Sequence, residues 1–270
     1  MEVHYWLAQL HEMTGLIEKT WVAVEEYGTP AQRAAFFLSL AGANLKRDRY
    51  VVSEDTLRYA RIALEAYRET GNLIKIAWAQ YNLGFYHLLL GNLDEAEQLM
   101  QAALAIAERT GDVTVQSYCW TYLTIGRRIR GQVEKTRQCN SQAMVIAKAV
   151  QRSEDIGMSE ANLAWIAWRE HRLSEAQEHG HTALTIWQQT PLVYPFYLAA
   201  LFPLIAVALA QHQIVEAVSH ARALLAPEQR RLPAALTAAL QAAIQEAGQP
   251  ETARAHLEQA LALAQEIGYL

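Results

Sequence analysis

Residues 73–112, LIKIAWAQYNLGFYHLLLGNLDEAEQLMQAALAIAERTGD, contain the pattern that decides the fold. Apolar residues recur every three to four positions from Ile74 to Leu90, and again from Leu93 to Arg109, which is the period of an amphipathic α-helix. Gly91 and Asn92 stand between the two segments, as residues of a tight turn do. The stretch therefore predicts two helices joined back to back as a hairpin.

The same unit recurs along the whole chain. Small residues at Gly84 and Ala96 fall where the two helices of a hairpin must come close, and Leu83 beside them marks the register. The marker leucines are spaced 33, 43, 40, 40, 41 and 36 residues apart, and they are Leu7, Leu40, Leu83, Leu123, Leu163, Leu204 and Leu240. We therefore predict an all-α chain, a single solenoid domain over residues 1–270 that forms a right-handed superhelix. Its seven helix-turn-helix hairpins are expected at about 1–28, 29–71, 72–111, 112–152, 153–191, 192–227 and 228–270.

This pattern resembles the tetratricopeptide repeat, in a form of about 40 residues where the common period is about 34. The positions that carry the resemblance are Leu83, Gly84, Gly91, Ala96 and Ala103. The chain departs from the family where Gln80 and Glu160 replace a large aromatic residue early in the first helix. The long period looks like the sensor arms of bacterial signal-transduction ATPases and of maltose-regulator-type transcription activators. The resemblance implies that the concave face recognises a protein, a peptide or a small inducer.

Charge and hydropathy narrow the possible partners and the location. The 270 residues carry a formal charge of −5 and no long basic run, which argues against a nucleic-acid partner. Residues 191–211 are nearly uncharged, but Pro195 and Pro203 interrupt them, so we predict a buried helix rather than a membrane span. Pro203 is expected to kink or interrupt that helix and so to loosen the array. No secretory signal is visible, and we therefore expect a cytoplasmic protein.

The residues of common catalytic and metal sites are not arranged for that chemistry. His179 and His181 lie on different sides of a predicted helix, which makes a poor metal pair, and no phosphate-binding loop or nucleophile elbow is present. Cys119 and Cys139 are 20 residues apart, so a disulfide is conceivable, but two reduced, half-buried thiols are favoured. We expect no enzyme, no cofactor and no bound metal.

The candidate binding residues follow from the resemblance, because in that family the first helix of each hairpin lines the concave wall. The positions that project onto this wall are Trp78, Tyr81, Asn82, Phe85, Tyr118, Ile125, Arg128, Met158, Asn162, Trp165, Trp168 and Phe202. Aromatic residues at helical spacing fit either a groove or the core. Two roles fit the basic residues Arg127, Arg128 and Arg130. They could complement the negative end of the first helix of their hairpin. Alternatively, together with Arg169 and Arg172, they could bind a carboxylate or phosphate at the groove edge.

We therefore expect a scaffold whose groove binds a protein or peptide segment, as the regulatory arm of a larger bacterial signalling protein would. The first alternative is a regulator that senses a peptide or small inducer. The second is a self-association module in which the aromatic wall or the first hairpin forms a homodimer. That hairpin is expected to break at Gly15, and it begins without a polar capping helix. We therefore expect either that an upstream domain or a partner covers Trp6 and Leu10, or that the first hairpin is slightly frayed.

Overall fold

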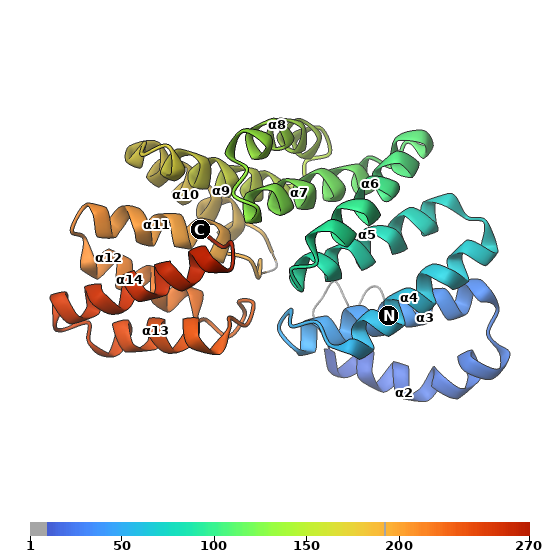
Figure 1. The fold of residues 1–270 in the computed structure, drawn as a ribbon. Helices are drawn as coiled ribbons and strands as arrows, with labels where there is room; N and C mark the ends of the chain where they lie inside the picture. The colour runs from blue at the N-terminus through green and yellow to red at the C-terminus, as the bar shows by residue number, and fades with distance from the viewer. Residues whose placement is uncertain (1–9, 192) are drawn as a thin grey trace. The chain divides into compact units, whose positions relative to one another are not determined.

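The computed structural model describes residues 10–191 and 193–270, which form helices joined by turns, with no strand among them. In chain order the helices are α2 (Leu10–Tyr27), α3 (Pro30–Arg47), α4 (Glu54–Thr70), α5 (Leu73–Leu89), α6 (Leu93–Thr110), α7 (Val113–Ile129), α8 (Val133–Ala149), α9 (Ser153–Arg169), α10 (Leu173–Gln188), α11 (Leu198–Ala210), α12 (Ile214–Leu224), α13 (Ala234–Gln245) and α14 (Pro250–Glu266) (Figure 1). Consecutive helices pack against each other from α2 to α6 and from α8 to α14. The predicted all-α solenoid is confirmed, while the handedness of a superhelix stays a prediction.

The chain divides into two compact units, residues 1–122, called unit 1 below, and residues 123–270, called unit 2. The division falls inside α7.

Each predicted hairpin from 29–71 to 228–270 encloses two consecutive helices. The predicted break at Gly15 is wrong, because α2 runs through it, and a helix tolerates one glycine at a cost of about 1 kcal/mol. The side chains of Trp6 and Leu10 are not among those that the structure describes, so what covers them stays a prediction.

Local sequence explains where the helices begin and end. Thr29 caps α3, since its hydroxyl accepts from Gln32 N at 3.3 Å while the Gln32 side chain accepts from Thr29 N at 3.0 Å. Ser53 caps α4 after the longer turn, accepting from Thr56 N at 3.2 Å. Gly111 ends α6 in the left-handed conformation with a φ of 72°, which carries no steric penalty for glycine.

Small residues set the spacing within the hairpin of α5 and α6. A Cβ added at Gly84 would lie 3.1 Å from Met100 Cγ and 3.2 Å from Ala96 O, so the predicted close approach of the two helices is confirmed. Fully buried alanines line the facing side of α6, at Ala96, Ala103 and Ala107. The first helices of this hairpin and the next two begin at Leu73, Val113 and Ser153, which places the same unit every 40 residues.

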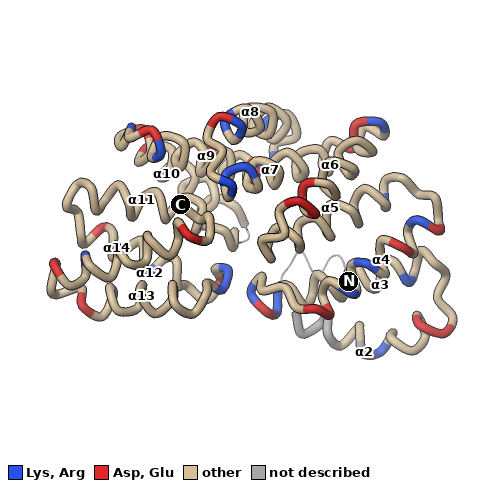
Figure 2. Tube along the Cα trace, viewed as in Figure 1, with Lys and Arg blue, Asp and Glu red and all other residues tan. Residues whose placement is uncertain are grey.

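Helix α11 forms the centre of unit 2. It carries no charged residue, as its uncoloured tube in Figure 2 shows, and residues 199–209 are all buried. Trp165 and Ile166 of α9, together with apolar residues of α12, α13 and α14, complete the same core. The predicted buried helix is therefore confirmed for residues 198–210 of the uncharged stretch, whereas residues 193–197 before it are not helical. Within the described part of the chain, no helix has the length and hydrophobicity that crossing a membrane requires.

Pro203 does not interrupt α11, which continues to Ala210. The predicted interruption is therefore wrong, whereas the kink and the looser array stay predictions. Proline lacks the backbone N–H that would bond to the carbonyl four residues earlier, which here belongs to Ala199. That carbonyl instead accepts a hydrogen bond from Arg128 Nη2 at 2.8 Å. A side chain of α7 thus satisfies the backbone group that the proline leaves open.

Candidate functional site

Five aromatic side chains of unit 1 form a continuous row between α5 and α7. Tyr81 stacks on Tyr118 with ring centroids 4.9 Å apart, and Phe85 contacts Tyr122 at 4.7 Å. Trp78 meets Tyr118 edge-on at 5.6 Å. We call Trp78, Tyr81, Phe85, Tyr118 and Tyr122 the aromatic row. The structure thus brings together four residues that the sequence predicted for the binding wall.

The aromatic row is mostly packed and exposes one end. Trp78 is half-buried, whereas the other four rings are only 6–8% exposed. Asn82, also half-buried, donates from Nδ2 to Trp78 O at 2.7 Å, so its amide group is engaged within its own helix. Sequence reasoning missed Tyr122, although its position four residues after Tyr118 puts both on one helical face. Only Trp78 and Asn82 of unit 1's predicted wall offer sizeable surface.

In unit 2 the predicted wall is largely core. Met158, Asn162, Trp165 and Phe202 are at most 1% exposed, so the expectation that they line an open groove is wrong. Trp165 and Phe202 belong to the core that α11 forms with the last helices of unit 2, which leaves their rings no free face. Ile125 and Trp168 remain half-buried.

Arg128 also lies in the interior rather than at a groove edge. The residue is 4% exposed, and its guanidinium donates to Ala161 O at 3.3 Å, Asn162 Oδ1 at 3.4 Å, Ala199 O at 2.8 Å and Tyr269 O at 3.0 Å. Burial lowers the pKa of Arg128 to about 9. The predicted grip on a carboxylate or phosphate is therefore wrong for Arg128, because its donors bind neutral groups of unit 2 itself. Arg128 does lie in the last turn of α7, which is the position that the predicted complement to the helix end requires.

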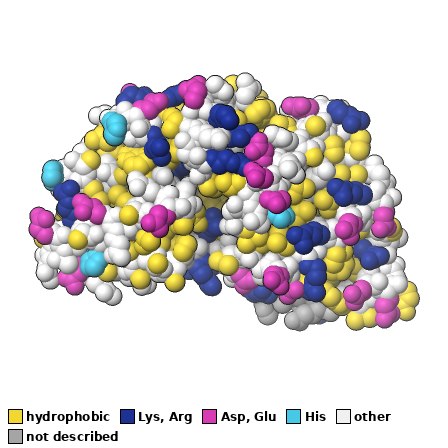
Figure 3. Space-filling view, in the orientation of Figure 1, with side chains coloured by type: hydrophobic (Ala, Val, Ile, Leu, Met, Phe, Trp, Pro, Cys, Tyr) yellow, Lys and Arg dark blue, Asp and Glu magenta, His cyan; other side chains and the backbone are white. Residues whose placement is uncertain are grey.

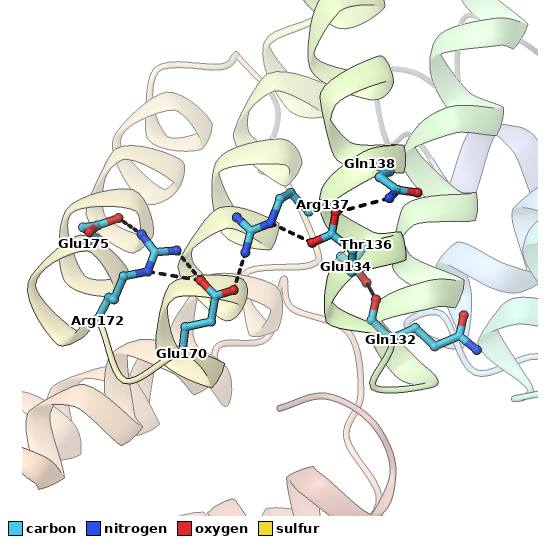
Figure 4. A network of polar contacts seen from close by, with 8 residues as sticks. All are labelled: Gln132, Glu134, Thr136, Arg137, Gln138, Glu170, Arg172 and Glu175. Atoms are coloured by element: carbon cyan, nitrogen blue, oxygen red, sulfur yellow. Dashed lines mark hydrogen bonds and ion pairs between the residues drawn. The ribbon is translucent and has the colours of Figure 1, made fainter.

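The other arginines of the predicted grip lie on the surface of unit 2. Arg172 pairs with Glu175 and with Glu170, the latter at 2.6 Å, and Glu170 also binds Arg137, which reaches Glu134 at 3.3 Å (Figure 4). These side chains are exposed or partly exposed, so each pair contributes at most about 1 kcal/mol. Arg169 is exposed, with its guanidinium 5.5 Å from the Trp165 ring. Arg172 is therefore engaged by carboxylates of the protein itself.

The titratable side chains that could carry other chemistry are dispersed. Cys119 is fully buried, which raises the pKa of its thiol, and Cys139 is half-buried; both are thiols rather than a disulfide. His179 contacts Glu160 at 2.6 Å and His181 faces Glu216 at 3.6 Å, so the two histidines point to different helices, as predicted. In the ranges that the structure describes, no group of three or more His, Cys, Asp or Glu side chains is arranged to hold a metal ion.

Comparison with known proteins bears on the segment that contains the aromatic row. No curated protein matches the chain. The family model described as tetratricopeptide repeat matches residues 75–128, about a fifth of the chain. This segment runs from α5 to the end of α7 and includes all five residues of the aromatic row. The chain is therefore a protein that contains tetratricopeptide repeats, over residues 75–128.

Proposed function

We propose that the chain is a non-catalytic interaction module that binds a segment of another protein at the exposed end of the aromatic row in unit 1. Tetratricopeptide repeats commonly mediate protein–protein interaction and are typically non-catalytic, which supports the proposal at a coarse level. The observation that carries it is the half-buried Trp78, held edge-on against Tyr118 inside the matched segment. A tryptophan that packing holds rigid is a common energetic anchor of protein interfaces.

Charge indicates the chemistry of the partner segment. Residues 1–122 contain ten Lys and Arg against fifteen Asp and Glu and so carry the whole charge of −5, whereas residues 123–270 contain thirteen of each. Figure 3 shows hydrophobic atoms at the surface of α4, α5 and α6 between these charged groups. A partner with an apolar anchor flanked by lysine or arginine complements such a surface. We place this module in a larger signalling protein, as the likeness of its long repeats to sensor arms implies.

The test is selection from a displayed library of random peptides, followed by affinity measurements on single variants. We expect enriched peptides to combine an apolar anchor with basic residues, and Trp78→Ala to weaken their binding at least about tenfold. Trp168→Ala is the matched control, because Trp168 is also a half-buried tryptophan, and it lies in unit 2. Circular dichroism verifies that both variants keep their helices.

Two results would change the assignment. Equal binding by both variants would remove the aromatic row as the binding surface. A mass that rises with concentration in light scattering, and that Trp78→Ala abolishes, would assign the row to self-association instead.

A further inference from the structure

The residues after α14 fold back onto unit 2. Gly268 adopts a φ of 76°, and Tyr269 N donates to Ala264 O at 2.8 Å, five residues earlier. These features end the helix with a Schellman motif, which turns the chain sharply at the glycine. Local sequence therefore fixes the direction in which Gly268, Tyr269 and Leu270, called the docked segment below, leave α14.

The docked segment contacts α7, α11 and Arg230, all within unit 2. Gly268 lies so near α7 that an added Cβ would be 2.6 Å from Ile129 Cγ2. The ring of Tyr269 stacks on Phe202 of α11 at 6.0 Å, and the Arg230 guanidinium lies 5.5 Å from the same ring. Leu270 is 4% exposed. The site therefore selects a residue without a side chain, then an aromatic ring, then an apolar residue.

Arg128 binds the backbone of the docked segment, because its Nη2 donates a hydrogen bond to Tyr269 O at 3.0 Å. Its other acceptors are the carbonyls of Ala161 and Ala199 and the amide oxygen of Asn162, all of them neutral. Burying a guanidinium against neutral acceptors alone is costly. Release of the docked segment lets water solvate the guanidinium. This solvation offsets part of the free energy that the lost contacts contributed, and so favours exchange of the docked segment for another chain.

We propose that the docked segment is an internal ligand that occupies an exchangeable recognition site made by Arg128, Ile129, Phe202 and Arg230. The site accepts a partner chain that carries a glycine–aromatic–aliphatic sequence, which displaces Gly268–Leu270. The chemistry of this occupant is that of the segment already seated there. The proposal concerns unit 2 and does not rest on the partner surface proposed for unit 1.

The test measures binding of a fluorescent synthetic peptide, AQEIGYL, which copies residues 264–270 and is amidated so that no terminal carboxylate takes part. We expect the Tyr269→Ala protein to bind this peptide at least tenfold more tightly than the wild type, because its internal competitor is weakened. The peptide AQEIGAL, which lacks the ring, should not bind. Adding Arg230→Leu to Tyr269→Ala should abolish the gain, since the cation beside the ring is lost.

A second variant distinguishes undocking of the segment from a change in the fold caused by the loss of the Tyr269 ring. Gly268→Ala undocks the segment, Tyr269 included, by the clash with Ile129 without changing the tyrosine itself, so it should show the same gain in a protein of unchanged helicity. Equal affinity of the wild type and of both folded variants for AQEIGYL overturns the proposal, as does equal binding of AQEIGAL. Dimers of the wild type that Tyr269→Ala dissociates would support the site and make a second copy its occupant.

Discussion

At the scale of the residue, Arg128 connects segments of unit 2 that lie far apart along the chain. Its hydrogen bonds connect α7 with α9, α11 and Tyr269, 141 positions further along the chain. Replacing it with methionine keeps the length of the stem and leaves three buried acceptors and one part-buried acceptor without this donor. We expect Arg128→Met to lower the free energy of unfolding by about 2–4 kcal/mol, measured by urea denaturation.

The matched control for this substitution is Arg127→Met, on the neighbouring position of α7. Arg127 is only half-buried, so its replacement should change the unfolding free energy by less than about 1 kcal/mol. Equal losses in the two variants would show that the buried hydrogen bonds of Arg128 contribute nothing specific.

Gly157 makes room for the indole of Trp187. A Cβ at this position would lie 2.4 Å from Trp187 Nε1, which donates to Glu154 O at 3.1 Å. Gly157→Ala should therefore displace the ring and destabilise the protein by about 1–3 kcal/mol, with a shift in tryptophan fluorescence. Gly248→Ala is the control, because nothing lies within 4 Å of the Cβ it adds. Similar stability of the two variants would contradict this account of the packing.

His220 makes the stability of unit 2 depend on pH. Burial lowers the pKa of its imidazole, against the opposing charge of Glu216. Above the unfolded-state pKa of about 6.5, the imidazole is neutral in the folded and in the unfolded protein. Below that pH the unfolded chain binds a proton that the folded chain does not bind, so acid lowers the free energy of unfolding. We expect the unfolding free energy to fall from pH 7.5 to 5, and to fall less in His220→Gln than in the control His256→Gln. His87, whose pKa burial also lowers, keeps part of the dependence in both variants. An unchanged pH profile in His220→Gln would remove His220 as a cause.

At the scale of the element, α11 and Arg128 are expected to be energetically coupled through one carbonyl. In the wild type, Ala199 O accepts from Arg128 because Pro203 has no N–H to offer. In an Arg128→Met protein this carbonyl loses its donor, and Pro203→Ala supplies a helical one. Pro203→Ala should therefore recover about 1 kcal/mol in that background and change the otherwise wild-type protein less. A double-mutant cycle with purely additive effects would contradict the coupling.

The elements themselves could be predicted because their signals are local. The apolar period, the Thr29 and Ser53 caps and the glycine turns all act within a few residues, and the helices lie inside the expected hairpin ranges. The candidate wall was harder to predict, because the same aromatic spacing fits a groove or a core. What buries Trp165 and Phe202 is α11 with the last helices, and no local pattern specifies that contact. The partnership of Arg128 with Tyr269 is likewise invisible to periodicity, since the two residues are 141 positions apart.

At the scale of the whole molecule, the two units differ in what holds them together. Unit 1 contains the aromatic row and the full formal charge, whereas unit 2 is electrically balanced and contains a buried polar network. In that network Asn162 donates to Asn140 Oδ1 at 3.3 Å and accepts from Arg128, while Asn140 donates to Ser159 O at 3.1 Å. A fully satisfied network of this kind favours one specific packing of its helices.

The molecule should therefore lose order in one unit when Arg128 is removed. All four acceptors of Arg128 lie in residues 123–270, so hydrogen exchange of Arg128→Met should accelerate in α9, α11 and α14 and remain near wild type in α3 to α6. Gly84→Ala is the reciprocal variant, because its Cβ would press on Met100 of α6, and it should accelerate exchange in unit 1 alone. Because α7 runs through the division between the units, it is the one helix expected to respond to both changes. Uniform acceleration along the chain in either variant would mean that the solenoid unfolds as one cooperative body, and that the division at residue 122 has no energetic counterpart.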